Sequence, residues 1–183
     1  DWAAQAPSPY QRENRLGMVR RFAHHARAED PRHDLVPRDV FAQQHRRTFP
    51  HIFSTDELSQ LLEASARLQP RGSLRPHTYY ALFGLLAATG LRISEAMHLL
   101  LSDVTTAGLV VRNTKFKKTR LVPLHPSAAG ALERYLGQRQ VCAGDDDHVF
   151  VSTDGRALSY AMINGTFHRL LKSVDLRLKP GAS

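Results

Sequence analysis

The sequence predicts an α+β fold that is mainly helical and contains one small antiparallel β-hairpin. Six segments of the chain are predicted to be helical, and two short β-rich runs lie between the fourth and the fifth of them. The composition supports a packed core, since 42% of the 183 residues are hydrophobic and 23% are charged. No internal repeat interrupts this order of elements.

The N-terminal part is expected to be one amphipathic helix followed by a linker. Residues 8–29 place Leu16, Val19 and Phe22 near helical spacing, with arginines on the other faces, and Pro31 ends the segment. Residues 31–51 lack a clear period and are rich in proline, which is typical of an extended connection. We therefore place a domain boundary between residues 48 and 49.

The second part begins at a capping box formed by Ser54 and Glu57, which predicts a helix to about Leu68. Pro76 opens the next helix, whose almost wholly apolar sequence predicts burial. Gly90 is expected to end it in a left-handed conformation.

Shorter elements follow. A short helix is predicted from about Ile93 to Leu100, and residues 109–111 and 121–124 form the hairpin, with a loop of four to five residues. Pro126 and Ser159 begin the last two helices, and residues 148–151 are a candidate strand.

The composition excludes several classes of protein. No run approaches the roughly 18 apolar residues that a membrane-spanning helix needs, and the N-terminus has no signal-peptide core. The single Cys142 excludes a disulfide within the chain and a cysteine zinc site. His148 follows three aspartates, but a flexible acidic turn with one histidine is a poor metal cage, so we expect no metal. We expect a cytoplasmic protein without membrane contact.

The charge predicts an anionic partner, most often nucleic acid. The formal net charge is +8 and the isoelectric point is about 10.1. Twenty of the 25 basic residues are arginine and five are lysine, yet Lys115, Lys117 and Lys118 lie within four residues. From charge alone, this cluster is either a solvated hairpin tip or a functional site.

Arg92 is the strongest candidate for an anion-binding residue. It lies two residues after Gly90, where a buried helix is expected to end, and at the start of another helix, where free backbone N–H groups and a five-donor guanidinium could bind phosphate together. Spacing alone also allows Arg92 to pair with Glu95 or Asp103 and to fix the helix junction.

Two segments resemble a known family. LLAATGLRISEAMHLLLSDV and VVRNTKFKKTRLVPLHP, in this order, are similar to the catalytic domain of the tyrosine recombinases, or phage integrase family, over about residues 50–175. The resemblance implies that Arg92 is the first catalytic arginine, that Lys115 is the hairpin lysine and that Asp103 is structural. Residues 8–30 are similar to the last helix of the family's DNA-clamping domain. Residues 1–48 would then be the C-terminal part of that domain plus linker, and residues 49–183 the N-terminal part of the catalytic domain.

The family's chemistry gives each of these residues an expected role. Members clamp double-stranded DNA and cut one strand with a tyrosine, giving a 3′-phosphotyrosyl link without a metal or cofactor. Arg92 would neutralise charge on the phosphate, Lys115 would protonate the leaving 5′-oxygen, and Lys117 and Lys118 would contact the DNA backbone. Because the loop around Lys115 lacks the family's frequent glycines, Lys117 is a rival for the acid role.

The chain departs from the family pattern after residue 174. It stops before the family's His-x-x-Arg segment and its nucleophilic tyrosine. We therefore expect this chain to bind DNA without forming the phosphotyrosyl intermediate, whereas the full-length parent would recombine DNA as a tetramer of protomers. The alternatives are a non-catalytic, truncated recombinase that acts as a competitor or regulator, and an unrelated basic RNA- or ribosome-associated protein.

Overall fold

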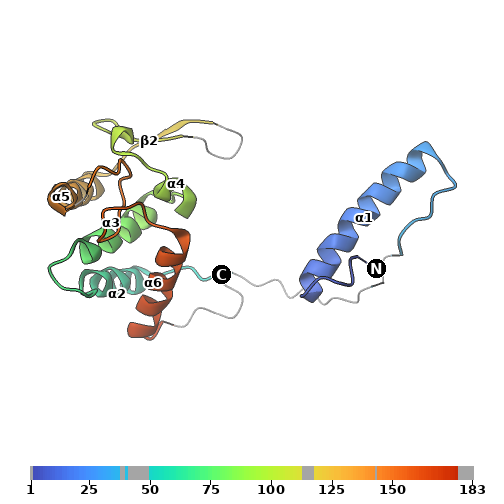
Figure 1. Ribbon diagram of the computed structural model, residues 1–183, viewed down its shortest axis with the longest axis horizontal. Coiled ribbons are helices and arrows are strands. Elements are labelled where there is room, and N and C mark those ends of the chain that lie inside the picture. Colours follow the sequence, from blue (N-terminus) through green and yellow to red (C-terminus); the bar gives the residue numbers. More distant parts are fainter. Residues whose placement is uncertain (1, 38–39, 41–49, 113–117, 143, 177–183) are drawn as a thin grey trace. The chain divides into compact units, whose positions relative to one another are not determined.

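The chain forms two compact units, Asp1–Phe49 and Pro50–Ser183. The computed structural model describes residues 2–37, 40, 50–112, 118–142 and 144–176 of the chain (Figure 1). Each unit is treated by itself below.

The first unit is built on one long helix, α1 (Pro9–Glu29), which confirms the helix predicted over residues 8–29. The Ser8 hydroxyl accepts a hydrogen bond from the Gln11 backbone N–H at 3.2 Å, so a serine cap and a proline begin the helix. The predicted apolar stripe is only partly buried. Leu16 is 7% exposed, whereas Phe22 is 71% exposed, because the described part of this unit has no second helix to cover it.

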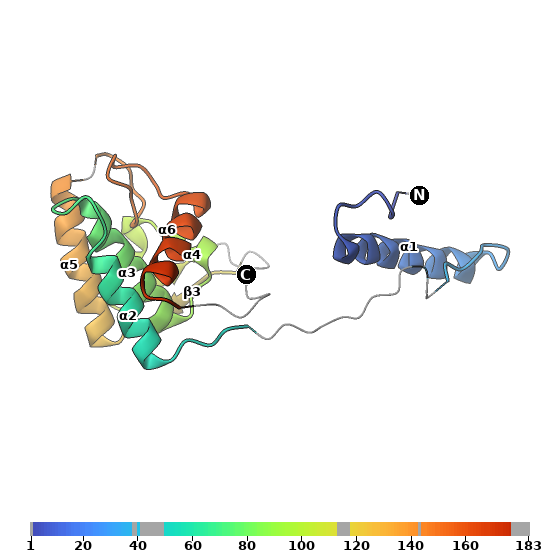
Figure 2. The ribbon, with the colours of Figure 1, turned by 90° about the horizontal axis from the view of Figure 1, so that it is seen from below.

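Among its described residues, the second unit has five α-helices and a small sheet. Its helices are α2 (Thr55–Ala66), α3 (Leu74–Thr89), α4 (Ile93–Met97), α5 (Pro126–Cys142) and α6 (Tyr160–Ser173). Helix α3 lies between α2 and α5, and α6 packs on α2 and α4, as Figure 2 shows. The mainly helical α+β class is therefore confirmed. No helix in the described ranges is both long enough and apolar enough to cross a membrane.

The core explains why α3 is almost wholly apolar. Leu82 on α3, Leu109 on a strand and Phe150 in the chain after α5 are all at most 1% exposed and belong to one apolar cluster. The ring of Phe150 stacks on that of Tyr135 from α5, with the centroids 5.5 Å apart. The core therefore joins α3, α5 and the sheet, and Ala96 of α4 belongs to the same apolar cluster.

The predicted helix ends are mostly confirmed. Ser54 and Glu57 form the capping box of α2, and Gly90 ends α3 with φ of +64°. Helix α3 begins at Leu74, two residues before Pro76, because proline is tolerated in the first turn of a helix. Helix α4 ends at Met97 instead of Leu100, and the chain continues into a 3-10 turn, η1 (Leu101–Asp103).

The predicted hairpin is confirmed, but the sheet has three strands. Strands β1 (Val104–Thr105), β2 (Gly108–Val111) and β3 (Arg120–Val122) pair antiparallel in that order, with Val111 opposite Arg120. The connection between β2 and β3 spans residues 112–119, so it is longer than the predicted four to five residues. Residues 113–117 lie outside the described ranges.

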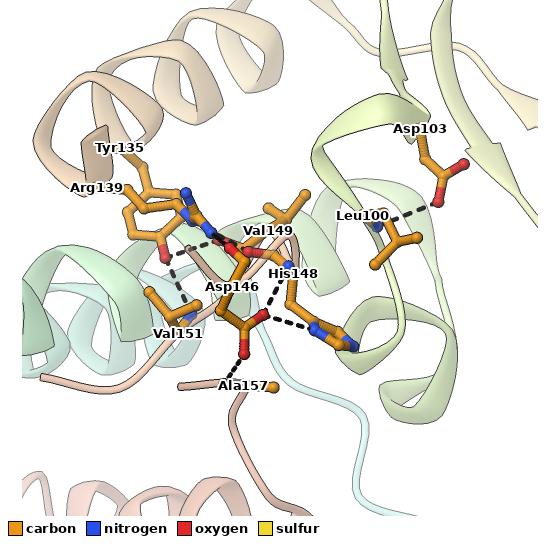
Figure 3. A network of polar contacts seen from close by, with 9 residues as sticks. All are labelled: Leu100, Asp103, Tyr135, Arg139, Asp146, His148, Val149, Val151 and Ala157. Atoms are coloured by element: carbon orange, nitrogen blue, oxygen red, sulfur yellow. Dashed lines mark hydrogen bonds and ion pairs between the residues drawn. The ribbon is translucent and has the colours of Figure 1, made fainter. Parts of the chain in front are cut away.

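Residues 148–151 do not form the predicted strand. His148 and Val151 make isolated bridges to Leu100 and Ala157, and side chains fix the segment in between. The guanidinium of Arg139, which is 5% exposed, donates from Nε to the carbonyl of His148 at 3.0 Å and from Nη2 to that of Asp146 (Figure 3). A side chain from α5 thus pairs backbone carbonyls that a neighbouring strand would otherwise pair.

The Asp146 carboxylate is the centre of this network. Its Oδ1 accepts hydrogen bonds from the backbone N–H of His148 at 2.9 Å and from the ring Nδ1 at 2.7 Å, and its Oδ2 accepts the Ala157 N–H at 2.9 Å (Figure 3). The hydrogen bonds from His148, above all the one from its backbone, lower the pKa of Asp146 from 3.8 to about 2.

Replacing Asp146 by asparagine is expected to lower the free energy of unfolding at pH 7 by about 1–3 kcal/mol, since bonds to a charged acceptor are lost. The folded-state pKa lies below the ordinary value, so the wild-type advantage is complete above pH 4 and is lost as the pH falls toward about 2. Urea denaturation at pH 7 and at acid pH measures both effects. Asp145→Asn, which changes an exposed neighbouring carboxylate, is the control and is expected to leave stability unchanged.

Candidate nucleic-acid interface around Arg92

The turn between α3 and α4 holds Arg92 at the surface. Gly90 reverses the backbone, and the Thr89 hydroxyl accepts the Leu91 N–H at 3.3 Å. Leu91 is buried in the core, while the Arg92 side chain is 59% exposed. The apolar residue thus anchors the turn, and its neighbour is left facing solvent.

Glu95 is the buried acceptor for this arginine. Its side chain is 6% exposed. Its Oε2 accepts the Arg92 backbone N–H and its Oε1 accepts Nη1 of the same residue, both at 2.9 Å. Of the two pairings that spacing allowed, the one with Glu95 is therefore correct and the one with Asp103 is wrong.

A second arginine binds the same carboxylate. Arg120, at the start of β3, donates from Nη1 to Oε1 of Glu95 at 3.1 Å and from Nη2 to Oε2 at 2.9 Å. Burial raises the pKa of the Glu95 carboxyl, but the hydrogen bonds from Arg92 and Arg120 outweigh it, so the pKa lies below its ordinary value. Two guanidinium groups and one carboxylate leave one net positive charge at this point of the surface.

Asp103 anchors the other side of the hairpin. Its side chain is 3% exposed, its Oδ1 lies 2.5 Å from Nε of Arg112, and its Oδ2 accepts the Leu100 N–H at 3.1 Å. Arg112 directly follows β2 and Arg120 begins β3. The buried carboxylates of Asp103 and Glu95 therefore bind the two strands at the ends that the connecting loop joins.

The expected contribution of a helix N-terminus is not supported. Helix α4 has five residues, which is little more than one turn, and its dipole is correspondingly weak. The Arg92 N–H, which could have faced an anion, donates to Glu95. The positive charge of this site therefore comes from side chains.

Of the three lysines predicted to contact DNA, only Lys118 lies within the described residues. Lys115 and Lys117 lie outside the described residues, so their roles stay predictions. Lys118 is exposed and lies two residues before β3.

Arg120 is the site residue that sequence reasoning missed. It stands 25 positions after Glu95, and only the strand register and the packing of the sheet beside α4 bring the two together. A basic residue directly before the β-rich run was the only signal, and arginine is common throughout this chain.

Two tyrosines of the second unit have structural roles. The hydroxyl groups of Tyr79 and Tyr135, both buried, donate to the backbone carbonyls of Met162 at 3.3 Å and Val149 at 3.0 Å. Within the described ranges, no group of three or more histidine, cysteine, aspartate or glutamate side chains could hold a metal ion.

A hollow in the second unit lies away from this site. It has a volume of about 900 Å³ between α2, α3 and α5 and is lined in part by Arg67, Arg71 and Arg134. None of its lining residues belongs to α4 or the sheet, so it is separate from the Arg92 site.

Comparison with known proteins identifies relatives that match most of this chain. Residues 51–182 match the model of the phage integrase family. A putative integrase/recombinase, y4rB, of Sinorhizobium fredii is 40% identical over 95% of this chain and 59% of its own length. Tyrosine recombinase XerD of Brucella abortus is 32% identical over 80% of this chain and 49% of its own length. The chain thus spans about half the length of these relatives.

Solved structures share the fold. The recombinase XerA superposes with a TM-score of 0.60 at 26% identity and covers 93% of this chain and 56% of its own. The Tn1549 transposon integrase, solved in complex with circular intermediate DNA, gives a TM-score of 0.70 at 19% identity, covering 100% of this chain and 66% of its own. With Arg92 placed after Gly90 and the hairpin fixed beside it, the chain belongs to the phage integrase family of tyrosine recombinases.

Proposed function

We propose that this chain supplies the phosphate-binding and proton-donating part of the active site of a site-specific DNA recombinase or integrase. The observation that carries the proposal is Arg92, an exposed guanidinium held by the buried, ionised Glu95 in a chain of this family. In the full-length protein the reaction would cut one DNA strand with a tyrosine and pass through a 3′-phosphotyrosyl link.

Arg92 suits the phosphate role because its position is fixed before DNA arrives. Charge builds up on the non-bridging oxygens as the hydroxyl attacks, and donors that are already oriented stabilise that charge without reorganising. A guanidinium presents planar paired donors that match two phosphate oxygens, which an ammonium group cannot do.

Lys115 is the proposed general acid, with Lys117 as its rival. An ammonium can lose its proton when it is desolvated, whereas a guanidinium effectively cannot, so lysine is the suitable residue in an arginine-rich chain. Lys117 and Lys118 would add salt-dependent contacts to the DNA backbone.

The partners follow from the same proposal. They are double-stranded DNA and, for the full-length protein, further recombinase protomers. The solved structure of lambda integrase is a tetramer bound to a Holliday junction, and its fold is similar at a TM-score of 0.65. Residues 1–48 would belong to the DNA-clamping domain and residues 49–183 to the catalytic domain, and the protein would act in the cytoplasm.

DNA binding by this chain is expected to depend on Arg92 through a phosphate. The slope of log affinity against log salt should become shallower by about 0.9 in Arg92→Ala, as for one lost phosphate contact. Fluorescence anisotropy with a labelled duplex measures the slope.

Arg67→Ala is the matched control, since Arg67 pairs with Glu63 at 2.7 Å and its side chain is 69% exposed, close to the 59% of Arg92. Its slope should equal that of the wild type. An unchanged slope in Arg92→Ala would contradict the proposal.

We assign no tyrosine of this chain as the nucleophile: Tyr79 and Tyr135 donate to backbone carbonyls, Tyr80 lines the hollow between α2, α3 and α5, Tyr10 lies in the first unit and Tyr160 begins α6. A nicked suicide substrate is therefore expected to give no covalent complex with the 183-residue chain. Covalent DNA on the chain in a denaturing gel would overturn that assignment.

A further inference from the structure

We propose that Arg120 is a positioning residue for Arg92 and acts through their common acceptor, Glu95. This inference rests on the proposed function, since it assumes that Arg92 binds phosphate. It adds Arg120, the first residue of β3, to the residues that are proposed to bind phosphate.

The first step is the hydrogen bonding of Glu95. A carboxylate offers about four lone-pair sites. Glu95 accepts four hydrogen bonds, two from Arg92 and two from Arg120, at 2.9–3.1 Å. Its acceptor capacity is therefore filled, and Arg92 is needed for only two of the four bonds.

The two arginines use their donors differently. Arg120 commits both terminal nitrogens to Glu95 in a forked, bidentate pair. Arg92 commits one terminal nitrogen, and its other side-chain donors make no hydrogen bond with the described residues. Arg92 can therefore reach a phosphate without leaving Glu95, whereas Arg120 cannot present its paired terminal donors.

Removal of Arg120 would change where Arg92 points. A buried carboxylate that loses two donors carries a large penalty, and the nearest cation on the described chain that can relieve it is Arg92. The Arg92 guanidinium is expected to turn and take over the fork on Glu95. Its outward donors would then be withdrawn from the DNA.

The position of Arg120 is set independently of Arg92. Arg120 pairs with Val111 in the register of β2 and β3, whereas Arg92 is placed by the turn after α3. The sheet therefore supplies a fixed second donor, and Glu95 is the link between the two elements.

A double-mutant cycle on duplex DNA affinity tests the inference, with the full 183-residue chain and fluorescence anisotropy at constant salt. Arg120→Ala is expected to weaken binding about three- to tenfold when Arg92 is present and less than about twofold in Arg92→Ala. Arg120→Lys should recover part of the loss, because an ammonium can satisfy one oxygen of Glu95.

Arg112→Ala is the matched control. Arg112, which directly follows β2, also pairs with a buried carboxylate, but that carboxylate is Asp103. Its effect on affinity should add to that of Arg92→Ala. Thermal unfolding monitors each variant, and Arg120→Gln replaces Arg120→Ala in the cycle if the alanine variant does not fold.

The outcomes separate the two proposals. If the effects of Arg120→Ala and Arg92→Ala add, Arg120 does not act through Arg92, and this inference is overturned while the phosphate role of Arg92 stands. If Arg92→Ala leaves affinity and salt slope unchanged, the proposed function fails and this inference fails with it.

Discussion

Under the proposed function, strand cleavage by the full-length protein is expected to fall about 100- to 1000-fold when Arg92 is replaced by alanine, the usual cost of losing one oriented donor to a developing oxyanion. The loss should appear in the rate of covalent complex formation with saturating suicide substrate, because the charge on the phosphate is largest in the transition state. Quenched-flow measurement of the phosphotyrosyl product gives this rate.

Arg92→Lys and Arg67→Ala complete the experiment. Lysine keeps the charge but loses the planar fork, so its rate should lie between those of the wild type and Arg92→Ala. Arg67→Ala should cleave at the wild-type rate, since Arg67 lines the hollow between α2, α3 and α5. A wild-type rate in Arg92→Ala would remove Arg92 from the active site.

Gly108→Ala is expected to destabilise the second unit by about 2–5 kcal/mol, as the sum of an unfavourable backbone and a steric clash. Gly108 has φ of +130°, which side chains rarely adopt. A methyl group there would lie 2.3 Å from the carbonyl oxygen of Val122 and 2.9 Å from Cα of Pro123, so β2 and β3 would have to separate. Urea denaturation followed by circular dichroism measures the loss.

Gly137→Ala is the matched control for this change. Gly137 lies within α5 and nothing approaches the position of its added methyl within 4 Å, so alanine should stabilise the helix by about 0.5–1 kcal/mol. Equal stability of Gly108→Ala and the wild type would show that the close pairing at Gly108 is not required.

The helices were predictable because the residues that begin and end them act on nearby positions in the sequence. Ser54 with Glu57, Gly90 and Ser159 each act on backbone groups within three or four residues, so no tertiary information is needed. Propensity could likewise place β2 and β3.

The remaining fold depends on distant groups. Strand β1 has two residues, too few for a period to appear, and exists because β2 pairs with it. Residues 148–151 have the composition of a strand, but Arg139 and Tyr135 of α5 take their carbonyls, so no ladder forms. Sequence patterns do not reveal such competition.

The candidate site likewise has residues that the sequence could predict and one that it could not. Arg92 was predictable from its place beside Gly90 and from the family resemblance, and Glu95 is three residues away. Arg120 was not predictable, because its pairing with Glu95, 25 positions earlier, depends on where the sheet places the start of β3.

The shared carboxylate also has a consequence for how the reaction should respond to acidity. The pKa of Glu95 is below its ordinary value of 4.5, so its charge persists as the solution is acidified to about that pH, and arginines keep their protons far into the alkaline range. The arrangement of Arg92, Glu95 and Arg120 should therefore carry a constant charge through neutrality. An inflection in a plot of cleavage rate against pH between about 5 and 9 would then come from groups other than these three residues.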